Sequence, residues 1–197
     1  MELLFSMSAA AADENRALAQ ALRVRDPEVL DRLIEEYQYR LLRYLVSLTG
    51  ARALAEDLFQ ETWIRVLERG RQYDPRYRFE PWLFAIARNL FLDRVRRRPE
   101  VTLGLIEENG EETVELADTA SASPYDLFRQ EEAHRGVAQA MRSLAPMYRE
   151  ILSLRFQEEL GLEEIAAVAG IPLATVKTRL YRALARLQAR LPREMKP

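Results

Sequence analysis

The sequence predicts an all-α protein of two small helical domains joined by an acidic linker, the second domain containing a helix-turn-helix. Helix-forming Ala, Leu, Arg and Glu dominate the 197 residues, whereas glycine occurs only seven times. Apolar residues recur at helical spacing in several segments, and runs of β-branched residues are absent. Charge is also segregated along the chain, which the overall net charge of −2 conceals.

Four helices are expected in the first domain, which we place at residues 13–99. A frayed leader at 1–12 precedes a first helix at 13–24. Asp26-Pro27-Glu28 then supplies a capping carboxylate, a proline suited to the first turn and an acid near the positive helix end. The helix that it opens ends at Gly50. A third helix covers 52–69, and a fourth begins at Glu80-Pro81 and ends before Pro99, after a polar, tyrosine-rich loop at 71–78.

An acidic linker at residues 100–125 and a second domain at 126–192 complete the expected order. The range 99–126 contains eight acidic residues and no basic one, and it lacks sustained periodicity. Two further helices are expected at 126–143 and 147–158, the second opened by Pro146. With the segment that follows, they would form a small four-helix domain.

The segment 161–182 predicts a short helix, a tight turn and a longer helix. Gly170 supplies the positive φ that ends the first helix without a Cβ penalty. The second helix is expected to bury Val176, Leu180, Ala183, Leu184 and Leu187. Its other side offers Thr175, Lys177, Thr178, Arg179 and Arg182. A helix with one buried side and one cationic side suits the major groove of DNA, although exposed arginines are often only solvated.

Two strongly basic blocks support contact with nucleic acid. Residues 62–98 contain ten arginines and four acids, and residues 171–197 contain seven basic residues and one acid, so each block carries +6. The first block combines cations with aromatic rings and an amide, a mixture that can hold a single strand. Its candidate residues are Tyr73, Tyr77, Phe79, Arg88, Asn89, Asp93, Arg94 and Arg96–Arg98. Each ring taken alone is as well explained by the hydrophobic core.

Enzyme motifs are missing, so we expect no catalysis, no metal site and no cofactor. The chain has no cysteine and one histidine, His134, which stands among charged residues of an expected helix. It contains no glycine-rich phosphate-binding loop. The first residues are too acidic for a signal peptide, and no apolar run could span a bilayer. Together these features favour a cytoplasmic location.

Three segments together with the helix-turn-helix resemble the bacterial RNA polymerase sigma factors of the extracytoplasmic-function group. The segments are Asp57-Leu-Phe-Gln-Glu-Thr-Trp-Ile-Arg-Val-Leu67, Phe79-Glu-Pro-Trp-Leu-Phe-Ala-Ile-Ala-Arg-Asn-Leu90 and Leu144-Ala-Pro-Met-Tyr-Arg-Glu-Ile-Leu-Ser-Leu-Arg-Phe156. The resemblance covers about residues 26–98 and 126–191 in the same order. It implies that the first domain binds the polymerase clamp and the minus-ten promoter element, whereas the second reads the minus-thirty-five element. It also implies a linker in the polymerase cleft and an anti-sigma partner.

The resemblance implies roles for individual residues. Asp57, Gln60 and Glu61, by themselves an ordinary solvated face, match the clamp-binding helix. Asn89, Asp93 and Arg94 match the helix above the opened strand, and the loop 71–78 matches the one that captures a flipped base. Lys177, Thr178, Arg179 and Arg182 match the recognition helix. Gly161 departs from the family, which usually has a Ser or Thr helix cap there.

Two other interpretations stay open at this point. The first is a helix-turn-helix regulator with an N-terminal effector or dimerisation domain, which would not need a strand-trapping element. The second is a helical adaptor without a nucleic-acid role, which the two basic blocks disfavour. We expect a sigma factor that directs core RNA polymerase to promoter DNA and helps to melt it.

Overall fold

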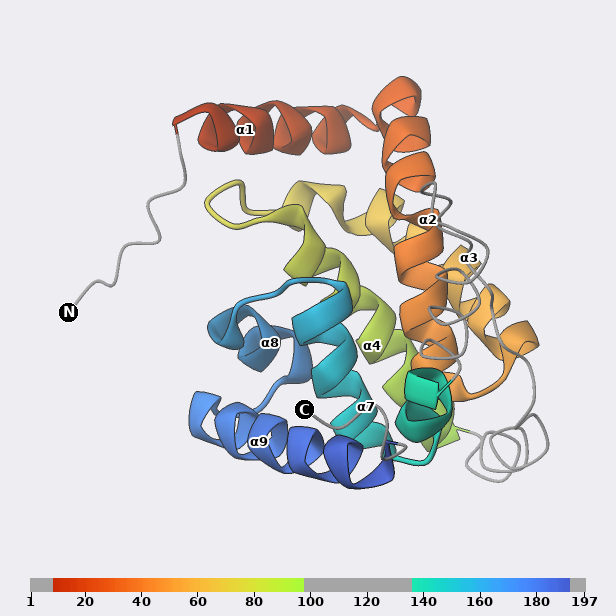
Figure 1. Cartoon of the computed structure of the whole chain (residues 1–197). Helices are drawn as coiled ribbons and strands as arrows, with labels where there is room; N and C mark the ends of the chain where they lie inside the picture. The colour runs from red at the N-terminus through yellow and green to blue at the C-terminus, as the bar shows by residue number, and fades with distance from the viewer. Residues whose placement is uncertain (1–8, 98–135, 192–197) are drawn as a thin grey trace, which may run out of the picture.

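A computed structural model describes residues 9–97 and 136–191, which we call the N-terminal half and the C-terminal half (Figure 1). All regular structure in these residues is helical, which confirms the predicted fold class. The N-terminal half contains α1 (Ala9–Val24), α2 (Pro27–Thr49), α3 (Arg52–Arg69), the short 3-10 turn η1 (Gly70–Gln72) and α4 (Phe79–Arg97). The C-terminal half begins with helical residues 136–142 and continues with α7 (Pro146–Leu152), the π-helical η2 (Ser153–Gln157), α8 (Leu162–Ala169) and α9 (Leu173–Arg190). The expected linker 100–125, the start of the next expected helix and His134 lie outside the described residues.

Helix α2 has the ends that the sequence predicts. The Asp26 carboxylate accepts hydrogen bonds from the backbone N–H groups of Glu28 and Val29, at 3.0 and 3.3 Å. At the other end Gly50 adopts a left-handed conformation with φ 69° and donates its N–H to the carbonyl of Val46. α2 is therefore a long helix with both ends capped, and α3 and α4 pack against it.

Helix α1 starts earlier than expected, whereas α3 covers the expected residues, Arg52–Arg69. α1 begins at Ala9, inside the segment expected to be a frayed leader. Gly70 ends α3 without a left-handed cap, since its φ is −53°. The glycine is needed there because a Cβ atom would lie 2.7 Å from the carbonyl oxygen of Leu22. Gly70 thus lets α1 lie directly on the turn that leads into the loop before α4.

The helix expected at 147–158 is divided in the structure. Pro146 opens α7, as predicted, but the α-helical part ends at Leu152. The turn then widens, and the N–H of Glu158 bonds to the carbonyl of Ser153, five residues earlier, at 3.1 Å. Glu159 follows in a left-handed conformation with φ 55°. This widened turn redirects the chain from α7 toward α8.

The two halves pack against each other around a common core. α7 and η2 lie on α2, and α8 lies on α4. Buried apolar residues of both halves form one cluster, which includes Leu41 and Leu83 from the first and Leu154 and Ile165 from the second. None of the helices in the described ranges is long and apolar enough to cross a membrane.

Candidate nucleic-acid interface

Helices α8 and α9 form the predicted helix-turn-helix. α8 ends at Gly170, which has the expected positive φ, 61°, and donates its N–H to the carbonyl of Ala166. The carbonyl of Pro172 then accepts the N–H groups of Thr175 and Val176 at 2.8 and 3.1 Å, which starts α9. Three residues of α9, Val176, Leu180 and Ala183, are buried. Their burial turns the opposite side of α9 toward solvent.

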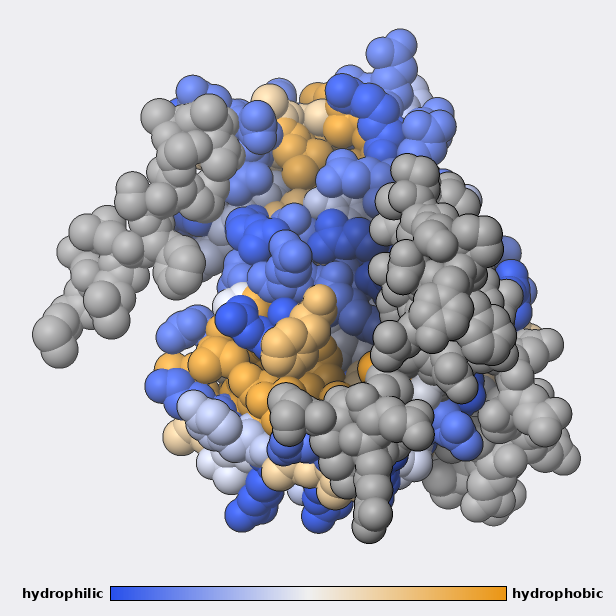
Figure 2. All heavy atoms as spheres, in the orientation of Figure 1, coloured by the Kyte–Doolittle hydropathy of each residue, from blue (hydrophilic) through white to orange (hydrophobic). Residues whose placement is uncertain are grey.

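The outward side of α9 offers cations that are not used within the chain. Lys177, Thr178 and Arg182 are exposed, whereas Thr175 and Arg179 are half-buried. Within the described part of the chain none of these three basic residues forms an ion pair. Figure 2 shows hydrophilic side chains projecting from the lower edge of α9, below the apolar surface over α8. The helix therefore presents hydrogen-bond donors to a ligand in solution.

Three residues of α9 differ from the sequence interpretation. Leu184, expected in the core, is exposed. The guanidinium of Arg186 lies over the Tyr148 ring of α7, 4.6 Å from its centroid, and is therefore engaged within the chain. Tyr181 is exposed, at 72% of its surface, and sequence reasoning missed it. Its spacing of four residues from Lys177 could have identified it as a member of the same helix face.

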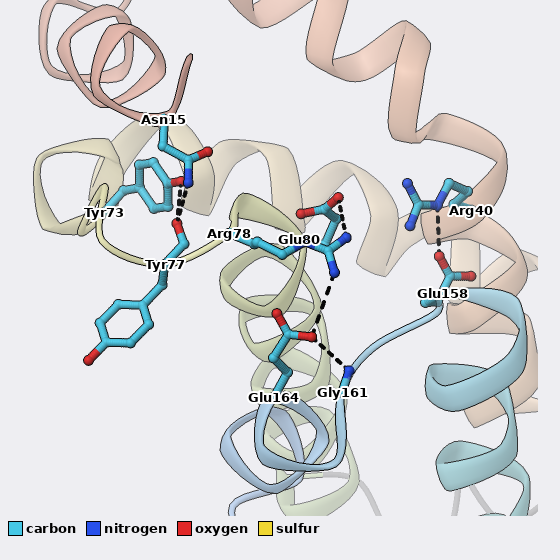
Figure 3. Close-up of polar contacts among 9 residues, drawn as sticks. All are labelled: Asn15, Arg40, Tyr73, Tyr77, Arg78, Glu80, Glu158, Gly161 and Glu164. Atoms are coloured by element: carbon cyan, nitrogen blue, oxygen red, sulfur yellow. Dashed lines mark hydrogen bonds and ion pairs between the residues drawn. The ribbon is translucent and has the colours of Figure 1, made fainter. Parts of the chain in front are cut away.

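The loop before α4 is held in place by α1 and by Tyr73. The Tyr73 hydroxyl donates to the carbonyl oxygen of Tyr77 at 2.8 Å, and the Asn15 amide of α1 donates to the same oxygen at 3.0 Å (Figure 3). Burial raises the pKa of the Tyr73 phenol, and nearby carboxylates raise it further. The loop thus has a defined conformation, which includes an ion pair between Arg76 and Asp74.

The structure corrects the expectation that Tyr73 and Phe79 stack on DNA bases. Both rings are in the core, 2% and 3% exposed, and pack edge to face with centroids 5.7 Å apart. A base would have to displace this packing. Tyr77 is the ring of this loop that remains accessible: it is 64% exposed and points away from the protein in Figure 3.

Arg88 and Asn89 are neighbours on α4 with different environments. Arg88 is largely buried, and its Nε donates to the Glu150 carboxylate of α7 at 2.5 Å. Asn89 is exposed, so its amide is accessible for hydrogen bonds to a base. The expected strand-binding face is therefore only partly open in this conformation.

The last turns of α4 carry the other candidates for strand binding. Asp93 forms an ion pair with Arg96 one turn later, and Arg94 lies 3.5 Å from the Glu61 carboxylate of α3. Arg97 is exposed, and no ion pair to another described residue occupies it. Arg98 lies outside the described residues. The contact between Arg94 and Glu61 brings together a residue expected to bind DNA and one expected to bind polymerase.

One face of α3 contains the residues expected to bind polymerase. Asp57 and Gln60 are exposed, and Glu61 is half-buried because it faces both Arg65 and Arg94. Ile64, which sequence reasoning missed, is exposed at 54% on the same face. Ile64 follows Asp57 by seven residues, or two helical turns, and this spacing could have placed it on the same helix face. This face of α3 therefore combines one accessible apolar side chain with polar ones.

Throughout residues 9–97 and 136–191, no group of three or more His, Asp or Glu residues is placed to hold a metal ion. The carboxylates near the candidate interface instead face arginines, as Glu150 does. The arrangement suits binding of anionic ligands through Arg, Lys and amide donors.

Comparison with known proteins gives two family matches and several similar proteins. The family model of sigma-70 region 2 matches residues 33–99, and that of sigma-70 region 4 matches residues 134–187. The ECF RNA polymerase sigma factor SigM of Bacillus subtilis is 35% identical over 161 residues, which cover 81% of this chain and 93% of SigM. The ECF RNA polymerase sigma factor SigE of Mycolicibacterium smegmatis is 34% identical over 152 residues, but the match spans 77% of this chain and 57% of SigE.

Two solved structures share the fold. The sigma factor RpoE, solved in complex with the anti-sigma factor NepR from Bartonella quintana, superposes with a TM-score of 0.62 at 24% identity and covers 81% of this chain and 94% of RpoE. CnrH, solved in complex with the cytosolic domain of CnrY, has a TM-score of 0.61 at 23% identity and covers 89% and 95% of the two chains.

Proposed function

This chain belongs to the extracytoplasmic-function group of bacterial RNA polymerase sigma factors. We propose which of its segments bind RNA polymerase and which bind each promoter element. The chain directs RNA polymerase to promoters. We assign residues 13–99 to the polymerase clamp and the minus-ten element, and residues 126–192 to the minus-thirty-five element. Residues 100–125 form the acidic linker between them. The family matches at 33–99 and 134–187 support this division.

The observation that carries the proposal is the outward side of α9. Lys177, Arg179 and Arg182 are spaced along one side of a helix whose other side is buried. Because none of them is engaged by a described carboxylate, their charge is available for phosphates and guanine edges. Thr178 donates to the Ala174 carbonyl at 2.9 Å, which leaves its oxygen lone pairs free to accept. α9 is thus suited to lie in the major groove.

Strand capture is assigned to the loop before α4 and to the exposed part of α4. Tyr77 supplies an accessible ring for stacking, and Asn89 an amide for reading a base edge. Arg97 can follow the phosphates of the same strand. Asp93 and Arg94 remain in the proposed set, whereas Tyr73 supports the loop from beneath instead of touching DNA.

Core polymerase is expected to bind the exposed face of α3. Asp57, Gln60 and Glu61 share this face with the exposed Ile64, so it offers both acidic and apolar side chains. A basic surface with an apolar pocket would be complementary to it. Glu61 also holds Arg94, so polymerase binding at α3 and strand binding at α4 would influence each other.

The remaining assignments follow from the same family. We infer that the chain has no catalysis of its own, acts in the cytoplasm with polymerase and is controlled by an anti-sigma factor. The solved relatives RpoE and CnrH support the last inference, because RpoE was solved with an anti-sigma factor and CnrH with the cytosolic domain of CnrY.

Co-migration with core RNA polymerase tests the proposal. A sigma factor should shift into the polymerase peak on gel filtration, and the complex should then bind promoter DNA more tightly than polymerase alone. A helix-turn-helix regulator would bind duplex DNA by itself and leave the polymerase peak unchanged. That second result would overturn the proposal.

A further inference from the structure

Helix α1 precedes the family match, and no residue of it has a role in the assignments above. The match to sigma-70 region 2 begins at residue 33, whereas α1 ends at Val24. Ala19 and Leu22 of α1 are buried in the common core, and α1 packs on the turn η1. The helix is therefore an integral part of the N-terminal half, placed beside the loop 71–78.

Two features fix where α1 lies. Gly70 leaves room for it, because a Cβ atom there would meet the Leu22 carbonyl oxygen. At the end of α1 the chain turns sharply: Arg25 is left-handed with φ 57°, and Asp26 donates its N–H to the Ala21 carbonyl at 3.0 Å. A residue with a Cβ atom keeps such a φ only where its surroundings hold it there. α1 thus has one defined position next to the loop.

Asn15 is a polar member of the side of α1 that faces the protein. It precedes Leu18, Ala19 and Leu22 by three, four and seven residues, so all four lie on one helix face. The Asn15 amide donates to the carbonyl oxygen of Tyr77 at 3.0 Å, across 62 positions of sequence. The face that packs α1 onto the protein therefore also binds the loop before α4.

Tyr77 is held by its backbone and exposes its ring. The Tyr73 hydroxyl donates to the same carbonyl oxygen at 2.8 Å, so this oxygen has two donors (Figure 3). The N–H of Tyr77 bonds to the Asp74 carbonyl at 3.1 Å, which closes a turn. The ring itself is 64% exposed, and the Arg76 guanidinium lies 5.9 Å from its centroid. The backbone is thus restrained while the ring remains available to a ligand.

A loop that is ordered before its ligand arrives binds more tightly than a mobile one. A mobile loop loses conformational freedom on binding, and this cost is avoided when the loop already has the bound shape. The Tyr77 ring can stack on a base only while the loop directs it away from the protein. The two hydrogen bonds to the Tyr77 carbonyl supply that restraint from side chains that need not contact DNA.

We propose that Asn15 of α1 is a positioning residue for strand capture: together with Tyr73 it holds the Tyr77 carbonyl and thereby directs the Tyr77 ring toward an unpaired base. This inference rests on the proposed role of Tyr77 in strand capture. It adds α1 to the segments that set the affinity for single-stranded DNA, through the loop and not through a DNA contact of its own.

Single-stranded DNA binding by holoenzyme, the chain bound to core polymerase, tests the proposal. The probe is a fluorescein-labelled strand that wild-type holoenzyme selects from a short random pool, after removal of strands that bind core polymerase alone. Asn15→Leu replaces the amide by a side chain of similar size that donates nothing, and Tyr73→Phe removes the second donor but keeps the ring. Gln20→Leu removes an exposed amide elsewhere on α1 and is the matched control. Circular dichroism verifies that each variant retains its helices.

Asn15→Leu should weaken binding about twofold, and Asn15→Leu with Tyr73→Phe about tenfold, because the carbonyl then loses both donors. Gln20→Leu should bind like the wild type. Hydrogen exchange of the loop 71–78, followed by mass spectrometry, should be faster in the double variant. In a Tyr77→Ala background the same two changes should weaken binding no further, because the ring that they position is gone.

Three results would overturn the proposal. Unchanged affinity in the double variant would show that the restraint of the loop does not matter for the strand. Weaker binding without faster exchange in the loop would show that Asn15 and Tyr73 act elsewhere. An equal loss of affinity with and without the Tyr77 ring would mean that they do not act through it. Failure of the proposed strand capture would be visible separately, as a wild-type holoenzyme that selects no strand beyond those bound by core polymerase, whatever the exchange of the loop.

Discussion

Gly70 lies where α1 crosses the end of α3, and a larger residue there would collide with α1. A Cβ atom would sit 2.7 Å from the Leu22 carbonyl oxygen and 3.0 Å from the Leu22 Cβ atom. We predict that Gly70→Ala lowers the free energy of unfolding by about 1–3 kcal/mol, because backbone must move to accept it. Urea unfolding measures the change. Gly161→Ala is the control, since its nearest contact would be 3.4 Å away on a flexible side chain. Equal losses in the two variants would contradict the collision.

Three buried tyrosines should make the fold sensitive to alkali. Burial raises the pKa of Tyr37, Tyr44 and Tyr73 above the ordinary value of 10.0, and for Tyr44 the neighbouring Glu150 carboxylate raises it further. A raised pKa means that the folded state favours the neutral phenol. The stability gained in this way is complete below pH 10 and is lost as the pH rises above it.

Absorbance at 295 nm during alkaline titration tests this account of the tyrosines. We expect part of the eight tyrosines to ionise near their ordinary pKa while the helical signal is retained, and the buried ones to ionise only as the chain unfolds. Tyr44→Phe should delay alkaline unfolding, because it removes one phenol that unfolding allows to ionise. Ionisation of all eight in a single early step, with the helices intact, would refute the prediction.

The helices were predictable where local chemistry sets their ends. Asp26 and Pro27 start α2, and Gly50 and Gly170 end α2 and α8 with the positive φ that glycine allows. The start of α1 at Ala9 was missed because residues 1–12 were interpreted as a frayed leader, although Ser8 is a residue type that often precedes a helix. The π-helical turn η2 was missed because it has no pattern of its own and depends on how α7 meets α2 and α8.

Helix α9 should determine promoter choice through its outward side. We predict that Lys177→Ala, Arg179→Ala and Arg182→Ala each weaken recognition of the upstream element by about 1–3 kcal/mol where the side chain contacts a base. Loss of a phosphate contact should instead weaken binding to all sequences alike. Arg186→Ala is the matched control, because the Arg186 guanidinium already lies over the Tyr148 ring. Holoenzyme binding to labelled duplexes measures these effects, and equal affinities for all four variants and the wild type would contradict the assignment.

The exposed face of α3 should determine affinity for core polymerase. Asp57→Arg with Glu61→Arg is expected to abolish binding, since like charges across an interface cost several kcal/mol. Asp31→Arg with Glu35→Arg makes the same charge change at the same spacing on the exposed side of α2, and should leave binding intact. Biolayer interferometry with immobilised core polymerase compares the pairs. Equal loss of binding in both would point to net charge and not to α3.

At the scale of the whole molecule, the contact between the halves could not be predicted from the sequence. The buried status of Glu150 and Glu158 depends on arginines more than 60 residues away, at separations of 62, 115 and 118 positions. The sequence indicated which helix faces are polar but not which of those faces meet. For the same reason the sequence placed Arg88 and Asn89 together among the residues expected to bind a DNA strand. In the structure Arg88 is paired with Glu150, whereas Asn89 is exposed.

Run-off transcription tests the central claim most directly, namely that this chain selects promoters for core RNA polymerase. The purified chain is added to core polymerase on fragments of genomic DNA. We predict discrete transcripts that require the chain and that disappear with the Lys177→Ala, Arg179→Ala, Arg182→Ala triple variant, while end-initiated background transcription persists. The same transcripts from core polymerase alone, or none that depend on the chain, would contradict the account.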